Sequence, residues 1–308
     1  MSFGIDRSIR RPHLTLKQRD MGYGIIFILP TLILLCLVIL YPVIQNIWLS
    51  FHHEDVLDPA AGTRFVGLEN FIELMGTSAF WRTVGNSLIL TGVSVAIQVG
   101  IGLPIAMLLN SGLRLQKLLR ALFILPWATP TFVAAFLWIW MLNPQHGTVN
   151  IFLQGLGFAA SDITWLGSPS TAMFSVIIAY VWKEIPWVIL IFIAGLQAID
   201  FSLREAARVD GASKWQEFWY VTLPGMRTVI LIVVILRTIW TFNWFDYVYL
   251  LTGGGPLKST YVLPLEVYQR GFVGFDFSGA AAVGVVMFIL LTGGALLYFR
   301  LLAREDSL

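Results

Sequence analysis

Six long apolar segments constrain the fold of this chain more than any other feature. Each is about 20 residues or longer, the length that an α-helix needs to cross the hydrocarbon layer of a membrane. A backbone in lipid has no water to bond to, so only helices and closed barrels satisfy its polar groups there. We therefore expect an all-α membrane protein with six transmembrane helices, at 23–48, 84–109, 118–142, 172–199, 228–250 and 279–302.

The composition supports a membrane location. Hydrophobic residues make up 57% and charged residues 12% of the 308 positions, and the mean hydropathy is +0.77. A water-soluble domain does not need so much apolar surface, so membrane lipid is an expected partner. The net charge of +2 and the lack of a basic face give no indication of nucleic acid binding. The single cysteine, Cys36, lies inside the first apolar segment and predicts neither a disulfide framework nor a cysteine metal site.

Lysine and arginine counts predict the orientation in the membrane. Fourteen of these residues lie in the N-terminus, the second and fourth connections and the C-terminus, whereas four lie in the other three connections. Cytoplasmic loops carry the excess of positive charge, so both termini and the fourth connection are expected to be cytoplasmic. The chain then divides into a basic N-terminal segment at 1–22, a six-helix domain at 23–302 and a tail at 303–308.

The fourth connection, here called the 200–224 loop, carries two helix-start signals. Ser202 with Glu205 and Ser213 with Gln216 each have the spacing of a capping box, in which a hydroxyl and a side-chain oxygen bond to the backbone across the first turn. Gly211 is expected to end the first short helix, because glycine enters the left-handed conformation cheaply. The second short helix is expected to end at Leu223-Pro224.

The first short helix presents a shallow face of small residues between charges. Such a face suits insertion into a groove of a partner protein, with the charges fixing the register; the alternative is a solvated loop that packs on its own protein. The residues concerned are Arg204, Glu205, Ala206, Ala207, Arg208, Asp210 and Gly211.

The spacing of this loop resembles a known family motif. Glu205-Ala206-Ala207, then Gly211, then Leu223-Pro224 is similar to the EAA loop in permease subunits of bacterial binding-protein-dependent ABC importers. Shorter matches at 65–71, 147–150, 165–166 and 245–256 resemble the maltose-type carbohydrate permeases. A large exterior domain of the enteric maltose permease is missing, and Thr228 stands where many relatives have proline.

The resemblance implies an ABC importer type I permease fold and a set of partners. These are a second, different permease subunit, two ATPase subunits that bind ATP and Mg, and an exterior solute-binding protein, all at a bacterial inner membrane. The residues Arg204 to Gly211 would dock on an ATPase, and this chain would carry no cofactor and no catalytic residue. The expected solute is a sugar, oligosaccharide or glycoside; a glycerol phosphate or polyol is the alternative, and a stand-alone secondary transporter is the alternative from another class.

Other chemical motifs are weak. The stretch 253–260, Gly-Gly-Gly-Pro-Leu-Lys-Ser-Thr, has leucine where a phosphate-binding loop needs glycine before the lysine, and an exterior turn is expected instead. His52-His53-Glu54-Asp55 lacks the ligand spacing of a metal site, so a solvated loop is favoured. No nucleophile and base stand at a recognisable spacing, so an enzyme is not expected.

Three charged residues lie inside apolar segments, where charges are costly and normally face a partner or a cavity. Lys183 and Glu184 lie 11 and 12 positions from one end of the fourth segment, and Arg237 lies 13 from the matching end of the fifth. At 1.5 Å per residue these depths are about 17 to 20 Å. We predict an ion pair between Glu184 and Arg237, with Lys183 extending towards the membrane surface or pairing elsewhere.

Aromatic and polar residues of the fifth segment predict a substrate pathway. Trp240, Asn243, Trp244 and Tyr247 have the spacing of one helical face, where aromatic rings would stack on sugars and an amide would bond to hydroxyls. The same rings would fit an interfacial aromatic belt, and the adjoining Asp246 favours the pathway. The further candidates are Glu184, Trp187 and Gln98. Prolines inside the segments, at Pro30, Pro104, Pro126, Pro130 and Pro186, predict breaks or kinks.

Overall fold

The computed structural model describes residues 16–54, 62–112, 114–158 and 163–305. Most of them are helical, and the only sheet in these ranges is a two-stranded antiparallel hairpin of β1 (His52–Glu54) and β2 (Thr63–Phe65). The predicted all-α membrane class is therefore correct. Most of the predicted N-terminal segment, along with the last three residues of the tail, lies outside the described residues.

Five helical stretches in the described residues are long and apolar enough to cross a membrane, and a bent pair makes a sixth if it counts as one span. The first stretch consists of α1 (Leu16–Leu35), the π-helical turn η1 (Cys36–Leu40) and α2 (Tyr41–Ser50). The others are α4 (Ser78–Leu109), α8 (Ala172–Ala198), the stretch that ends in α11 (Leu223–Phe242), and α14 (Phe277–Glu305).

The bent pair confirms a break inside the predicted span at 118–142, at one of the prolines where the sequence predicted a break or kink. α5 (Gln116–Ala128) and α6 (Thr131–Met141) meet at an angle of 94°. Pro130 has no backbone N–H, and the residue before a proline avoids the helical region. Thr129 is accordingly extended, at φ −72° and ψ 131°.

The fifth apolar segment, 228–250, is also broken, although it contains no proline. α11 ends at Phe242, and after three intervening residues a separate helix, α12 (Asp246–Thr252), begins. The side-chain amide of Asn243 donates to the carbonyl of Ile239 at 2.8 Å, which satisfies one of the last carbonyls of α11. The fifth span is therefore present, but its helix covers 214–242 and ends eight residues before the expected boundary at 250.

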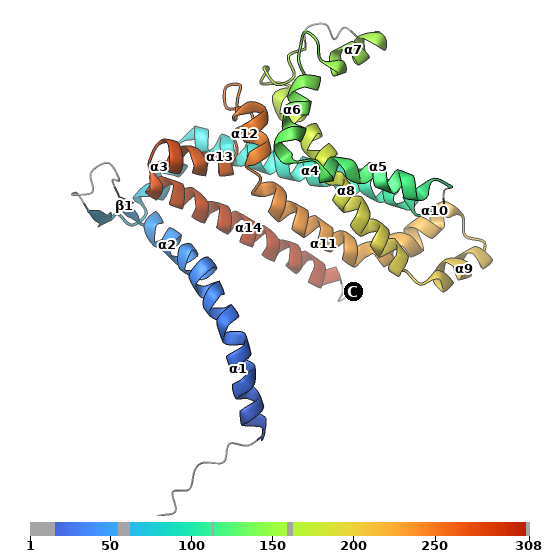
Figure 1. Ribbon diagram of the computed structural model, residues 1–308, viewed down its shortest axis with the longest axis horizontal. Helices are drawn as coiled ribbons and strands as arrows, with labels where there is room; N and C mark the ends of the chain where they lie inside the picture. The colour runs from blue at the N-terminus through green and yellow to red at the C-terminus, as the bar shows by residue number, and fades with distance from the viewer. Residues whose placement is uncertain (1–15, 55–61, 113, 159–162, 306–308) are drawn as a thin grey trace, which may run out of the picture.

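Short helices lie between the long ones. They are α3 (Glu69–Met75), α7 (Thr148–Gly155), α9 (Phe201–Val209), α10 (Lys214–Glu217), η3 (Phe218–Thr222), α13 (Leu263–Tyr268) and η4 (Gln269–Val273). The bundle formed by α4, α8, α11 and α14 runs between α13 at one end and the α9–α10 pair at the other (Figure 1).

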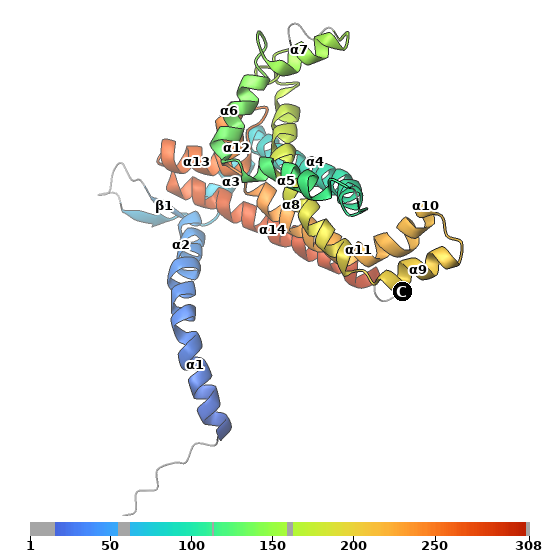
Figure 2. The same ribbon diagram turned by 45° about the vertical axis from the view of Figure 1, so that its right-hand side comes forward.

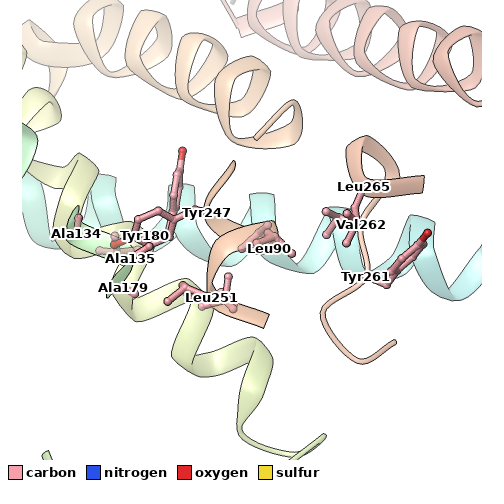
Figure 3. Packing of buried hydrophobic residues seen from close by; sticks show 14 residues of the cluster. Leu90, Ala134, Ala135, Ala179, Tyr180, Tyr247, Leu251, Tyr261, Val262 and Leu265 are labelled. Carbon is pink, nitrogen blue, oxygen red and sulfur yellow. The ribbon is translucent and has the colours of Figure 1, made fainter. Parts of the chain in front are cut away.

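The core has three apolar clusters, in which α4 and α8 take the largest share. One cluster joins α4, α6, α8 and α12 around Tyr180 and Tyr247, which are 2% and 1% exposed (Figure 3). A second packs Phe192 of α8 against Met226 and Val233 of α11. The third packs α4 against α14.

The first helical stretch leaves this core. Both views show α1 extending away from the bundle, whereas α2 lies beside the start of α14 (Figures 1 and 2). Residues 25–48 are exposed, and the side-chain amide of Asn46 in α2 donates a hydrogen bond to the carbonyl of Ala281 in α14, at 3.5 Å.

Candidate functional site

The 200–224 loop forms two short helices joined at a glycine. Gly211 has φ +83°, and its N–H and that of Ala212 bond to the carbonyls of Arg208 and Ala207, at 3.1 and 2.9 Å. These bonds satisfy the end of α9, as the sequence predicted. The capping box of Ser213 and Gln216 is also present.

The cap of α9 differs from the prediction. Its N-terminal capping residue is Asp200, whose carboxylate accepts from the N–H of Ser202 at 2.9 Å, so the expected box of Ser202 and Glu205 is wrong. Aspartate caps a helix as well as serine does, and here it lies two residues earlier. The bond from Ser202 lowers the pKa of Asp200.

A carboxylate on α10 ties the two helices together. Glu217 is buried and accepts from Arg208 through both oxygens, at 3.0 Å from Nε and 3.3 Å from Nη2. Nε of Arg204 lies 4.0 Å from the same carboxylate. The bond to Glu217 raises the pKa of Arg208. The two arginines therefore face inward to α10 as well as flanking the small-residue face.

The outward surface of α9 carries different residues. Glu205, Ala206, Val209 and Asp210 are exposed, with Val209 at 87%. Ala207 is half-buried.

The second short helix does not end at Leu223-Pro224, contrary to expectation. α10 continues through the π-helical turn η3 into α11, so that 214–242 form one helical stretch. Pro224 falls in the first turn of α11, where its missing N–H is tolerated because the preceding π turn bonds the N–H of Leu223 to Phe218 instead. The loop is thus joined to a membrane helix without a break.

The same helix carries a buried charge. Arg237 is 1% exposed, and its guanidinium donates from Nη1 to Glu184 at 3.0 Å, from Nε to Gln98 at 2.8 Å and from Nη2 to the hydroxyl of Tyr180 at 2.8 Å. The ion pair predicted between Glu184 and Arg237 is present. We call Gln98, Tyr180, Glu184 and Arg237 the Arg237 centre; it joins α4, α8 and α11.

Aromatic rings complete the surroundings of Arg237. Its Cζ lies 5.6, 5.9 and 5.8 Å from the ring centres of Tyr180, Trp187 and Trp240, within the range of cation–π attraction. The two indole rings meet edge to face at 4.9 Å, and Trp240 is 43% exposed. One side of the Arg237 centre is thus an aromatic surface open to its surroundings.

Lys183 lies beside this centre and holds the break between α5 and α6. Its ammonium donates to the carbonyl of Thr129 at 3.0 Å and lies 3.5 Å from that of Trp127 and 3.9 Å from Glu184. A broken helix leaves carbonyls without partners inside the membrane, and a lysine is able to satisfy them. Lys183 therefore pairs within the protein, the second of the two outcomes expected for it.

The remaining pathway candidates do not share one helical face, because α11 ends between them. Asn243 and Asp246 are exposed, whereas Tyr247 is 1% exposed. Trp244 packs edge to face on Tyr180 at 4.7 Å. The structure thus gathers Gln98, Glu184, Trp187 and Trp240 around Arg237 and leaves Asn243, Asp246 and Tyr247 outside that group.

Sequence reasoning missed two polar members of this region. Tyr180 binds Arg237 and shares a 2.8 Å hydrogen bond with Thr241. Tyr180 precedes Glu184 by four positions and Thr241 follows Arg237 by four, so both lie on the same helical faces as the ion pair. The four-residue spacing from Glu184 and from Arg237 is therefore a signal in the sequence that indicates both residues.

No metal site is present in the parts of the chain that the structure describes, where no three His, Cys, Asp or Glu side chains converge. His52 stacks on Trp48 at 3.8 Å and takes part in a hydrogen bond with its carbonyl. Asp55 of the suspected cluster lies outside the described residues. Stretch 253–260 is a turn between α12 and α13, as predicted.

These features define a multi-span helical protein. The chain belongs to the family described as "Binding-protein-dependent transport system inner membrane component", which matches residues 98–305. The EAA-type loop and the Arg237 centre both lie within that range.

Full-length relatives and solved structures agree with this assignment. The trehalose/maltose transport system permease protein MalF of Thermococcus litoralis is 36% identical over 285 residues, covering 92% of this chain and 95% of that protein. The sn-glycerol-3-phosphate transport system permease protein UgpA of Yersinia enterocolitica is 34% identical over 282 residues, covering 91% and 94%. A bacterial alginate ABC transporter, solved in complex with an alginate pentasaccharide-bound periplasmic protein, has a chain with the same fold. The TM-score is 0.77, the identity is 24%, and 92% of this chain and 93% of that chain are covered.

Proposed function

We propose that this chain is the transmembrane subunit of an ATP-driven importer and forms half of the pathway for a sugar, oligosaccharide or glycoside. The observation that carries the proposal is the unbroken helical stretch at 214–242, which joins the 200–224 loop to the helix of Arg237. A force applied at the loop is transmitted along such a helix into the middle of the membrane.

Docking of an ATPase subunit on α9 is the first part of the mechanism. The outward residues Glu205, Ala206 and Val209 are exposed, and the inward residues Arg204 and Arg208 hold α9 on Glu217. The loop would therefore move as one body when ATP closes the ATPases. ATP and Mg would bind to those partners, with none on this chain.

The remaining partners follow from the family. A second, different permease subunit would supply the other half of the pathway, and an exterior solute-binding protein would deliver the solute. The 200–224 loop and both termini would face the cytoplasm across a bacterial inner membrane, as the lysine and arginine distribution indicates.

Substrate class follows from the surroundings of Arg237. Each of its three nitrogens already donates one hydrogen bond, its charge is paired with Glu184 and its side chain is buried, so it does not offer a free cation to a phosphate. Trp187 and Trp240 offer aromatic surface, which stacks on the C–H faces of sugars. A neutral carbohydrate is therefore favoured; the glycerol phosphate alternative rests on the similarity to UgpA.

The test of coupling is assembly with the ATPase subunits and ATP hydrolysis stimulated by the binding protein in liposomes. Glu205→Arg reverses an exposed charge on α9, and the matched control Glu69→Arg makes the same change on exposed α3, near the other end of the bundle. We expect Glu205→Arg to lower ATPase association and stimulation at least tenfold, and the control to leave both unchanged. Equal behaviour of the two variants would mean that the loop is structural, and a stand-alone transporter would become the better explanation.

The test of substrate class is uptake by the same liposomes of maltose, trehalose and glycerol 3-phosphate, each with its binding protein. Trp240→Ala removes the more exposed ring and is expected to reduce carbohydrate uptake while ATPase association persists. Uptake of glycerol 3-phosphate alone would establish the alternative.

A further inference from the structure

A polar pocket of about 500 Å³ lies between the 200–224 loop and the end of the bundle. Its walls come from the C-terminal end of α4, at Asn110 and Ser111, from Leu196 of α8, and from both short helices of the loop. The cavity is large enough for a ligand of several heavy atoms, since a water occupies only about 30 Å³ of liquid volume.

The charges that line this pocket do not balance. Arg204, Arg208 and Lys214 supply three cations, and Glu217 is the one carboxylate among the lining residues. Both oxygens of Glu217 are already engaged by Arg208. The lining residues therefore carry a formal excess of two positive charges, and the neighbouring Glu205 is exposed and does not line the pocket.

Two of the three cations retain unused donors. Nε of Arg204 is buried and has no hydrogen-bond acceptor among the described residues, because Glu217 lies 4.0 Å away. A buried donor without an acceptor costs about 1–3 kcal/mol, which a bound anion would recover. Lys214 is exposed and makes no ion pair within the described part of the chain.

A purely structural role explains only part of this arrangement. Arg208 is accounted for by its two bonds to Glu217. The carbonyl of Leu109 at the end of α4 is already bonded by Gln116 and by Arg120, so it does not need the pocket cations. Arg204 and Lys214 remain without a full set of partners.

We propose that this pocket binds a phosphate-bearing anion, held by Arg204, Arg208 and Lys214. Guanidinium and ammonium groups are the usual partners of phosphate oxygens in proteins. The phosphate group belongs either to an anionic phospholipid or to a soluble molecule. The lipid source is favoured because Leu108 and Trp219, which follow the lining residues Met107 and Phe218 in the sequence, are 58% and 47% exposed.

Binding would link the loop to the bundle. The cations belong to α9 and α10, whereas Asn110 and Ser111 belong to the end of α4, so a ligand between them restrains the loop against the helix that carries Gln98. The bound anion would thus regulate how freely the 200–224 loop moves, whether or not an ATPase docks on its outer face.

The test uses the transporter complex in nanodiscs, without ATP. One arm measures equilibrium binding of radiolabelled inorganic phosphate in phosphatidylcholine discs, and the other measures retention of phosphatidylglycerol by native mass spectrometry after exchange from mixed discs. Lys214→Gln and Arg204→Gln remove pocket cations, and the control Arg114→Gln removes an exposed cation that does not line the pocket.

We expect one of the two probes to bind to the wild type and to the control variant. Each pocket variant should bind that probe about tenfold more weakly, which is the loss of affinity expected when one charge-assisted hydrogen bond is removed. Retention of phosphatidylglycerol would identify a lipid site, and saturable phosphate binding a site for a soluble anion. The proposal is overturned if neither probe binds the wild type, or if the pocket variants bind as the control does. Amide hydrogen exchange of each variant checks that α9 and α10 are still folded.

Discussion

Two ion pairs in this protein have the same length and very different surroundings. Arg237 and Glu184 lie 3.0 Å apart with side chains 1% and 7% exposed, whereas Arg208 and Glu217 lie 3.0 Å apart with Arg208 59% exposed. Coulomb attraction at a given distance grows as the surroundings become less polar, and so does the penalty for an unpaired charge. The distance between the two charges alone therefore does not determine how much each ion pair contributes to the stability of the protein.

The partners around each pair follow from this difference. Arg237 has a carboxylate, an amide oxygen and a hydroxyl, because an unsatisfied donor inside the membrane is costly. In the 200–224 loop the cations have fewer partners, because Nε of Arg204 is buried without an acceptor within hydrogen-bond distance and Lys214 is exposed. The buried centre fixes three helices, and the exposed cluster keeps charge available for a partner or a ligand.

The largest expected effect is that of Glu184→Gln. This change leaves Arg237 and Lys183 without a carboxylate and is expected to destabilise the fold by about 3–5 kcal/mol. Unfolding in mixed micelles measures the loss for Glu184→Gln, Arg237→Gln and the double variant. The double variant should lose less than the sum of the single variants; additive losses would contradict an energetic coupling between the two residues.

The same substitution of lysine by methionine is compared in the two regions, as Lys183→Met beside the Arg237 centre and as Lys214→Met in the 200–224 loop. Loss of the Lys183 ammonium leaves the carbonyls of Trp127 and Thr129 unpaired at the α5–α6 break, and about 1–3 kcal/mol of stability should be lost. Lys214 is exposed, and its change should stay within about 0.5 kcal/mol. Equal losses in the same unfolding assay would show that Lys183 does not hold the break.

Gly211→Ala tests the turn between α9 and α10. No atom lies within 4 Å of the position of an added Cβ, so strain at φ +83° is the only penalty. A residue with a Cβ pays about 1–2 kcal/mol in the left-handed region, and asparagine pays less. We expect Gly211→Ala to reduce hydrogen-exchange protection of α9, and Gly211→Asn to retain most of it. An unchanged alanine variant would mean that the turn adopts another conformation.

Salt should weaken the exposed ion pair and leave the buried one unchanged. At 1 M salt the Debye length is about 3 Å, so an exposed pair is screened and a buried pair is not. Arg208→Gln should therefore weaken the docking of α9 on α10 at low salt only. The measurement is hydrogen exchange of α9 at low and high salt, with Arg237→Gln as the salt-independent comparison.

The smallest expected effect is a pH dependence at Asp200. The bond from Ser202 lowers the pKa of the Asp200 carboxyl in the folded state. The ionised cap therefore stabilises α9 fully above the pKa of the unfolded chain, about 3.9, and this stabilisation is lost as the pH falls through the folded pKa. Protection of α9 should be constant from neutral pH down to about 4 and fall below it. Asp200→Asn keeps a cap that does not titrate, so its profile should lack that fall.

The sequence predicted much of the buried centre, because its signal is local. Charged residues are rare inside apolar segments, and equal depth from one end of two helices identified Glu184 as the partner of Arg237. Tyr180 was not found, since a tyrosine in an apolar segment has many roles. The end of α9 at Gly211 and the box of Ser213 were predicted for the same local reason.

The wrong predictions concern positions where a neighbouring residue or turn determined the structure instead of the residue on which the prediction was based. Ser202 was expected to cap α9, and Asp200 does so from two residues earlier. Pro224 was expected to end a helix, and the π turn before it lets the helix continue. The face from Trp240 to Tyr247 assumed an unbroken helix, and Asn243 ends it.

The sequence by itself determined the class, the number of apolar segments and the motif that assigns the family, because length, hydropathy and residue spacing follow directly from the order of residues. Only the tertiary structure decided the 94° angle of the break, the departure of α1 from the bundle, the pairing of Lys183 with the carbonyls at that break, and the pocket beside α4. These features depend on which side chains from distant segments meet, and the energy of such contacts is set by burial in the folded protein and not by separation along the chain.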